Sequence, residues 1–201
     1  MTTIAYLHGF RSSPQSIKAQ LFARTIASLP DEERPRFTVP SLSHDPRAAV
    51  DDVAAWIERE IAIAPAATLT LVGSSLGGFY ATHLAERFGT RAALINPTIR
   101  PYEDLAPSAG AQRNLYTGET FEVTAAHLAA LRALMVPHIT RPERYFLLVR
   151  TGDEVLDWRE AVVFYGGAWQ YVLGGGDHGW ADFAGEIPAV LRFATAAAGR
   201  R

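Results

Sequence analysis

Leu69-Thr-Leu-Val-Gly-Ser-Ser-Leu-Gly-Gly-Phe-Tyr80 is the stretch of sequence on which the predicted fold depends. Its first four residues predict a buried strand, and the apolar side chains that recur three and four positions apart after the serines predict a helix. Between them, Gly73-Ser-Ser75-Leu-Gly77 matches G-x-S-x-G, in which small neighbours permit a sharp turn and expose the central serine. Ser75 is therefore the candidate nucleophile. The alternative, a small-residue turn before an ordinary helix, is disfavoured by the strand and helix on either side.

The composition is that of an ordinary globular protein. With 201 residues, 48% of them hydrophobic and 20% charged, the chain is expected to form one domain over residues 1–201. A net charge of −2 gives no electrostatic reason to expect a nucleic acid or an anionic membrane as partner. The chain has no cysteine, which excludes disulfides and a thiol nucleophile. We find no signal-peptide pattern and no run of about 20 apolar residues, so we expect a cytoplasmic protein.

Strands and helices are expected to alternate along the chain. The expected strands cover residues 4–7, 37–39, 69–72, 92–95, 145–149 and 169–173, and the expected helices cover 17–29, 46–61, 76–88 and 187–198. Near-continuous apolar strands predict a mostly parallel sheet of about six strands with helices on both faces, which is an α/β fold. Functional sites of such sheets lie at the carboxyl ends of the strands. Chemically useful side chains follow four of these strands: His8, Ser75, Asp153 and His178.

Residues 98–141 interrupt this alternation between the fourth and fifth strands. They contain no clear strand pattern and one helical pattern, at residues 124–135. A long excursion at the site end of a sheet predicts a small lid or cap within the domain. A peripheral helix with a long loop is an equal alternative.

A serine hydroxyl needs a base, and the base needs an acid that orients it. The chain order serine, then acid, then histidine is that of α/β-hydrolases. Asp153 lies in the turn directly after the fifth strand, and we prefer it as the acid. Glu154 is expected to point elsewhere and Asp157 to face solvent. His178 lies in a glycine-rich loop after the sixth strand and is the predicted base.

An oxyanion in the transition state requires two backbone N–H donors. The N–H group of Leu76, directly after the nucleophile, is one candidate. The other is expected in the loop after the first strand, from Phe10 or alternatively Arg11, with Gly9 allowing close approach of the backbone. His8 precedes the nucleophile in the chain and fits this loop better than the role of base.

Two further patterns in the sequence concern cofactor and metal binding. Residues 174–179 match G-x-G-x-x-G, but they follow the last strand and no acidic residue stands about twenty positions later, so a dinucleotide cofactor is not expected. The chain has no H-E-x-x-H and no histidine pair four residues apart. We therefore expect neither a cofactor nor a metal.

Several segments together carry a family pattern. They are His8-Gly-Phe-Arg-Ser-Ser-Pro14, Val72-Gly-Ser-Ser-Leu-Gly-Gly78, Asn96-Pro97, Arg100-Pro-Tyr-Glu103, Tyr116-Thr-Gly-Glu119, Thr151-Gly-Asp-Glu-Val-Leu-Asp157 and Gly176-Asp-His178. From about residue 4 to 193 the chain resembles the YqiA/YcfP-like family of small bacterial esterases. The resemblance implies a Ser-Asp-His carboxylesterase for short acyl chains, with a compact sheet that lacks the first two strands of the larger fold. The sharp turn that carries Ser75, called the nucleophile elbow, is common to all α/β-hydrolases. The Asn-Pro and Tyr-Thr-Gly-Glu segments are more specific to this family.

The sequence therefore predicts a serine carboxylesterase that acts on small-molecule acyl esters through a covalent acyl-enzyme. A thioesterase or another acyl hydrolase would use the same three residues, and a peptidase is less favoured. From a different class, a ligand-binding protein with an inactive triad is the remaining alternative. The physiological substrate and the oligomeric state are not defined by the sequence.

Overall fold

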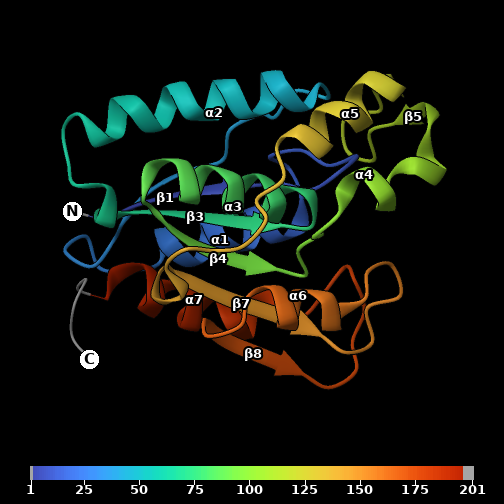
Figure 1. The fold of residues 1–201 in the computed structure, drawn as a ribbon. Helices are drawn as coiled ribbons and strands as arrows, with labels where there is room; N and C mark the ends of the chain where they lie inside the picture. The colour runs from blue at the N-terminus through green and yellow to red at the C-terminus, as the bar shows by residue number, and fades with distance from the viewer. Residues whose placement is uncertain (1, 197–201) are drawn as a thin grey trace.

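A computed structural model gives the fold and describes residues 2–196 (Figure 1). Six strands form one sheet in the order β2-β1-β3-β4-β7-β8, and every neighbouring pair is parallel. The strands are β1 (Thr3–Leu7), β2 (Arg36–Thr38), β3 (Leu69–Ser74), β4 (Arg91–Ile95), β7 (Tyr145–Arg150) and β8 (Trp169–Leu173). The predicted α/β fold class is thus confirmed.

Helices cover both faces of this sheet (Figure 1). The helices are α1 (Ile17–Ala27), α2 (Pro46–Ile61), α3 (Leu76–Phe88), α4 (Pro101–Asp104), α5 (Ala125–Ala133), α6 (Trp158–Phe164) and α7 (Ile187–Thr195). Four short 3₁₀ helices join them: η1 (Ala66–Thr68), η2 (Ala106–Ser108), η3 (Pro142–Arg144) and η4 (Phe183–Glu186). The closing helix was expected to reach residue 198, but residues 197–201 lie outside the described part of the chain. No helix within residues 2–196 combines the length and the hydrophobicity needed to cross a membrane.

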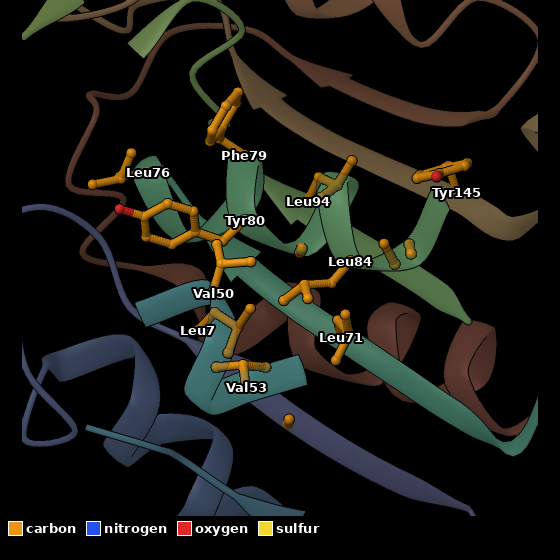
Figure 2. Close-up of a cluster of buried hydrophobic side chains, with 14 of the residues drawn as sticks. Leu7, Val50, Val53, Leu71, Leu76, Phe79, Tyr80, Leu84, Leu94 and Tyr145 are labelled. Atoms are coloured by element: carbon orange, nitrogen blue, oxygen red, sulfur yellow. The ribbon is translucent and has the colours of Figure 1, made fainter. Parts of the chain in front are cut away.

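The core has two halves, one on each face of the sheet. Alternate strand residues such as Leu7 and Leu71 pack with α2 and α3 on one face, and Figure 2 shows part of this cluster. The intervening strand residues, such as Tyr6 and Val72, pack with α1 and α7 on the other face. This division follows from the two-residue period of a strand, and it explains why the central strands are apolar throughout.

Residues 98–141 differ from the expectation. The prediction that they contain no strand was wrong, because β5 (Gly110–Arg113) and β6 (Thr120–Val123) form an antiparallel hairpin. These strands have four residues each and mix polar with apolar side chains, so they produce no apolar run in the sequence. The expected helix in this segment is present as α5. The function of the segment as a lid stays a prediction.

Candidate active site

The carboxyl ends of the parallel strands meet at one edge of the sheet, and the predicted triad residues lie there. Ser75 directly follows β3, Asp153 follows β7 and His178 follows β8. His178 Nε2 lies 3.1 Å from Ser75 Oγ, and His178 Nδ1 lies 2.8 Å from Asp153 Oδ2. The structure therefore brings the three side chains together in one hydrogen-bonded chain.

Ser75 occupies a strained turn between β3 and α3. Its backbone has φ 54° and ψ −121°, a region that residues with a Cβ atom rarely adopt. The glycines on either side are required by packing. A Cβ atom on Gly77 would lie 2.0 Å from the carbonyl oxygen of Leu7, and one on Gly73 would lie 2.3 Å from the carbonyl oxygen of Gly77. The G-x-S-x-G pattern thus allows α3 to pack directly against the end of β1.

Asp153 is placed to orient the imidazole of His178. Its side chain is only 2% exposed, and its Oδ1 accepts hydrogen bonds of 2.9 Å from the N–H groups of both Val155 and Leu156. Burial acts to raise the pKa of this carboxyl group, but the hydrogen bonds from His178 and the backbone outweigh it, so the pKa is lowered. A carboxylate at this position favours the tautomer with the proton on Nδ1. That tautomer leaves Nε2 of His178 free to accept the proton of Ser75.

The two alternative acids have other partners. Asp157 caps α6 by accepting a hydrogen bond from the N–H group of Arg159 at 3.0 Å, and its side chain is 52% exposed. This agrees with the expectation that it faces solvent. Glu154 accepts a hydrogen bond of 3.0 Å from the backbone N–H group of His178, so it contacts the backbone of the histidine rather than its ring.

The loop that carries His178 is held by two side chains that the sequence did not identify. The Nδ2 group of Asn96 lies 3.4 Å from the carbonyl oxygen of Asp177 and 3.2 Å from that of His178. The Nζ group of Lys18 donates a hydrogen bond to the carbonyl oxygen of Gly179. Three consecutive carbonyl groups of this loop are therefore bound by side chains from α1 and from the end of β4. Lys18 is the only lysine in the chain, which is the one sequence signal that singles it out.

Asn96 also gives a physical role to the Asn-Pro segment of the family pattern. It follows β4 with φ 40°, and its Oδ1 accepts a hydrogen bond of 3.0 Å from the N–H group of Arg150 at the end of β7. Pro97 packs so closely on α3 that a Cβ atom on Gly78 would lie 2.7 Å from Pro97 Cβ. The segment thus connects the elbow helix, β7 and the histidine loop.

We expect Lys18→Met to lower kcat about tenfold with little change in KM, because a misplaced catalytic group mainly slows the chemical step. Burial lowers the pKa of Lys18 to about 8, with Asp177 and Asp153 partly offsetting the effect. Above about pH 8, Lys18 loses the positive charge that strengthens its hydrogen bond to the carbonyl oxygen of Gly179. The wild type should therefore lose part of its kcat in this range, whereas Lys18→Arg, which keeps its charge, should not. Unchanged kcat at pH 7 in Lys18→Met would contradict this role.

The loop after β1 lies against the elbow. A Cβ atom on Gly9 would lie 3.1 Å from Ser75 Cβ, which is tighter than most such contacts, so glycine favours this close approach. The N–H groups of Leu76 and Phe10 have no hydrogen-bond acceptor within residues 2–196, and the same is true of Arg11, the alternative donor. These groups are available to a ligand atom beside the nucleophile.

His8 belongs to this loop, and both of its ring nitrogens are occupied. Nε2 accepts a hydrogen bond of 3.2 Å from the N–H group of Leu42, and Nδ1 lies 3.2 Å from the carbonyl oxygen of Gly9. Burial lowers the pKa of His8, which favours the neutral ring that this arrangement requires. His8 therefore shapes the loop and does not contact Ser75 as a base would.

The hairpin of β5 and β6 forms hydrogen bonds with the loop after β1. The N–H group of Leu115 donates to the carbonyl oxygen of Arg11 at 2.9 Å, and Asn114 Nδ2 donates to that of Ser12 at 2.8 Å. Residues 116–119, the Tyr-Thr-Gly-Glu segment, form the turn that joins the two strands of the hairpin. The N–H groups of Tyr116 and Thr117 donate to Asn114 Oδ1, so the segment supports Asn114, whose own partner Ser12 lies about a hundred residues away and could not be found from the sequence.

Backbone strain is concentrated around this site. Within residues 2–196, the non-glycine residues with positive φ are Arg11, Ser75, Asn96 and Trp180. All four lie in loops that follow strands of the main sheet. Such strain persists only where the surroundings enforce it, and it is frequent at functional sites.

The structure adds no metal site to this arrangement. In the described part of the chain, no three His, Asp or Glu side chains lie close enough together to hold a metal ion. The G-x-G-x-x-G match of residues 174–179 forms the loop that carries His178.

The sheet, the elbow after β3 and the strand-end loops define an α/β-hydrolase fold, and solved structures agree. A protein of Agrobacterium vitis S4, provisionally described as a hydrolase, is 18% identical with a TM-score of 0.74, over 97% of this chain and 88% of that chain. Est1E of Butyrivibrio proteoclasticus, solved with ferulic acid bound, is 13% identical with a TM-score of 0.67, over 96% of this chain and 87% of that chain. The esterase domain of a Rhodothermus marinus protein is 18% identical with a TM-score of 0.64, over 96% and 86%.

A family model described as an uncharacterised protein family, UPF0227, matches residues 3–195. The chain belongs to this family. The match confirms the resemblance to the YqiA/YcfP-like family and spans almost the whole sequence.

Proposed function

We propose that this protein is a serine carboxylesterase that hydrolyses short-chain acyl esters. The observation that carries the proposal is the hydrogen-bonded chain from Ser75 through His178 to Asp153, with distances of 3.1 and 2.8 Å. The strained turn at Ser75 and the unpaired N–H groups beside it support the same reaction, as does the likeness of the fold to esterases. The cysteine-free sequence is compatible with the reducing cytoplasm, where we place the enzyme.

The reaction follows from the roles of these groups. His178 Nε2 takes the proton of Ser75 while Ser75 Oγ attacks the ester carbonyl carbon, and Asp153 stabilises the resulting imidazolium. The N–H groups of Leu76 and Phe10 bind the oxyanion of the tetrahedral intermediate. The intermediate collapses, and the alcohol leaves with the proton from His178. A water molecule, deprotonated by His178, then attacks the acyl-enzyme and releases the carboxylic acid.

The length of the acyl chain is suggested by a pocket beside the oxyanion donors. Leu76 and Phe10 both line a small open pocket with a cavity volume of about 30 Å³. This volume is far below the range for sites that bind drug-sized ligands. We assign this pocket to the acyl part of an ester whose carbonyl oxygen lies between the two N–H groups, and its small size favours short acyl groups.

The test is hydrolysis of p-nitrophenyl esters from acetate to long acyl chains, together with a matching series of thioesters. We expect turnover that is fastest with short acyl esters. A fluorophosphonate probe should label Ser75, as detected by peptide mass spectrometry. An enzyme that turns over thioesters alone would be a thioesterase. A protein with no turnover and no labelling would be a ligand-binding member of the fold, which would overturn the proposal.

A further inference from the structure

The pocket beside the predicted oxyanion donors is lined by both aromatic and polar side chains. Its lining includes Phe10, Leu42, His44, Leu76, Tyr80 and Phe121, and we call it the acyl pocket. It is built from the loop after β1, the segment before α2, the elbow helix α3 and strand β6. The proposed esterase function assigns this pocket to the acyl group of the ester, because the pocket includes the residues of both oxyanion donors. Its chemistry therefore determines which acyl group is accepted.

Aromatic rings form one side of the acyl pocket. The rings of Phe10 and Phe121 meet edge to face, with centroids 5.8 Å apart. The ring of His44 stacks on Phe121 at 3.7 Å and is nearly parallel to it, and its Nε2 lies 3.4 Å from a carboxylate oxygen of Glu119. These contacts fix the width of the pocket, which suits a short acyl group better than a long flexible one.

Tyr80 places an unpaired hydroxyl group in this pocket. The residue lies on α3 and is only 3% exposed. Its hydroxyl group forms no hydrogen bond within residues 2–196, and it is not one of the polar atoms that the fold encloses without a partner, so it remains open to solvent through the pocket. Figure 2 shows the oxygen at the end of the ring that lies toward Leu76, away from most of the labelled core residues. The nitrogens of His8, by contrast, are both occupied.

The state of this hydroxyl group limits what it can bind. Burial and the nearby carboxylate of Asp45 raise the pKa of Tyr80, so the group stays protonated and can both donate and accept a hydrogen bond. Asp45 would repel a second carboxylate in the same place. A neutral oxygen, in a hydroxyl or keto group, is the complementary partner.

We propose that Tyr80 recognises a hydroxyl or keto oxygen on a short acyl chain, so that the preferred substrates are hydroxyacyl or oxoacyl esters rather than plain alkanoyl esters. This inference rests on the proposed esterase function and names its substrate class. When such a substrate binds, its oxygen replaces solvent as the hydrogen-bond partner of the Tyr80 hydroxyl group, whereas a plain alkyl chain would displace the solvent and leave the group unpaired. A site that contains a buried polar group discriminates against substrates that leave this group unpaired.

The test compares matched pairs of p-nitrophenyl esters: butyrate with 3-hydroxybutyrate, and pentanoate with 4-oxopentanoate. For the wild type, we expect kcat/KM to be about tenfold or more higher for at least one oxygenated ester than for its plain partner. In Tyr80→Phe, which removes only the hydroxyl oxygen, this ratio should fall about tenfold. The ratio is independent of how much of the variant is folded.

Tyr165→Phe is the matched control. Its side chain is also buried, but its hydroxyl group already forms a hydrogen bond of 2.7 Å with Thr82 Oγ1. Removing it should leave the substrate ratio at the wild-type value. An active wild type without preference in either pair, or a ratio that Tyr80→Phe does not change, would overturn the inference. A wild type with no turnover and no labelling of Ser75 would overturn the esterase proposal instead.

Discussion

Ser75→Ala should lower kcat for p-nitrophenyl acetate by on the order of 10³-fold or more. The substitution removes the one oxygen that lies 3.1 Å from His178 Nε2, while the N–H groups of Leu76 and Phe10 remain. The variant then retains binding and oxyanion stabilisation without a nucleophile, so a small residual rate above that of water is expected. The strained backbone at Ser75 is as accessible to alanine as to serine, so the fold should persist.

Ser74→Ala is the control for this experiment. Ser74 is the adjacent serine at the end of β3, and its side chain is buried and forms no hydrogen bond with His178. This variant should keep the wild-type kcat and should still react with the fluorophosphonate. If Ser75→Ala hydrolyses esters at the wild-type rate, the nucleophile lies elsewhere and the proposed mechanism fails.

The elbow could be recognised from the sequence because the residues that it requires stand at fixed positions on either side of Ser75. A Cβ atom at position 73 or 77 would lie 2.3 or 2.0 Å from a backbone carbonyl oxygen, so glycine is required at both positions, two residues before and two after Ser75. The central strands β1, β3, β4 and β7 were also predictable, since their burial on both faces gives continuous apolar runs. In a parallel sheet the carboxyl ends of the strands lie at one edge. The predicted strand ends therefore indicate that Asp153 and His178 lie near Ser75.

The supporting groups could not be found in this way, because their partners are distant in the chain. Lys18 contacts the backbone at position 179, and Asn96 contacts it at positions 177 and 178. Both bind carbonyl groups, which every residue has, so no side-chain pattern in the loop indicates the contact. The hairpin was missed for a related reason: its short, half-polar strands are stabilised by pairing with each other and not by burial.

Asp153→Asn is expected to lower kcat by on the order of 10³- to 10⁴-fold. The asparagine can still accept hydrogen bonds through one oxygen, but its amide nitrogen would face His178 Nδ1 as a donor. That contact favours the tautomer with the proton on Nε2, which cannot accept the proton of Ser75. Asp157→Asn removes a carboxylate that is 52% exposed and caps α6, so it should keep the wild-type kcat. A fully active Asp153→Asn would exclude Asp153 as the acid, and Asp157 would be tested next.

The same variant should change how stability depends on pH. The pKa of Asp153 in the folded protein lies below its ordinary value of 3.8. A carboxyl group of this kind stabilises the fold above its unfolded pKa, and the contribution is lost as the pH falls through the lower folded value. The free energy of unfolding should therefore be higher for the wild type than for Asp153→Asn at pH 6, and the difference should shrink below about pH 4. Urea unfolding of both proteins across this range measures it, and a difference that stays constant down to pH 2 would show that the carboxylate is not held by the hydrogen bonds described here.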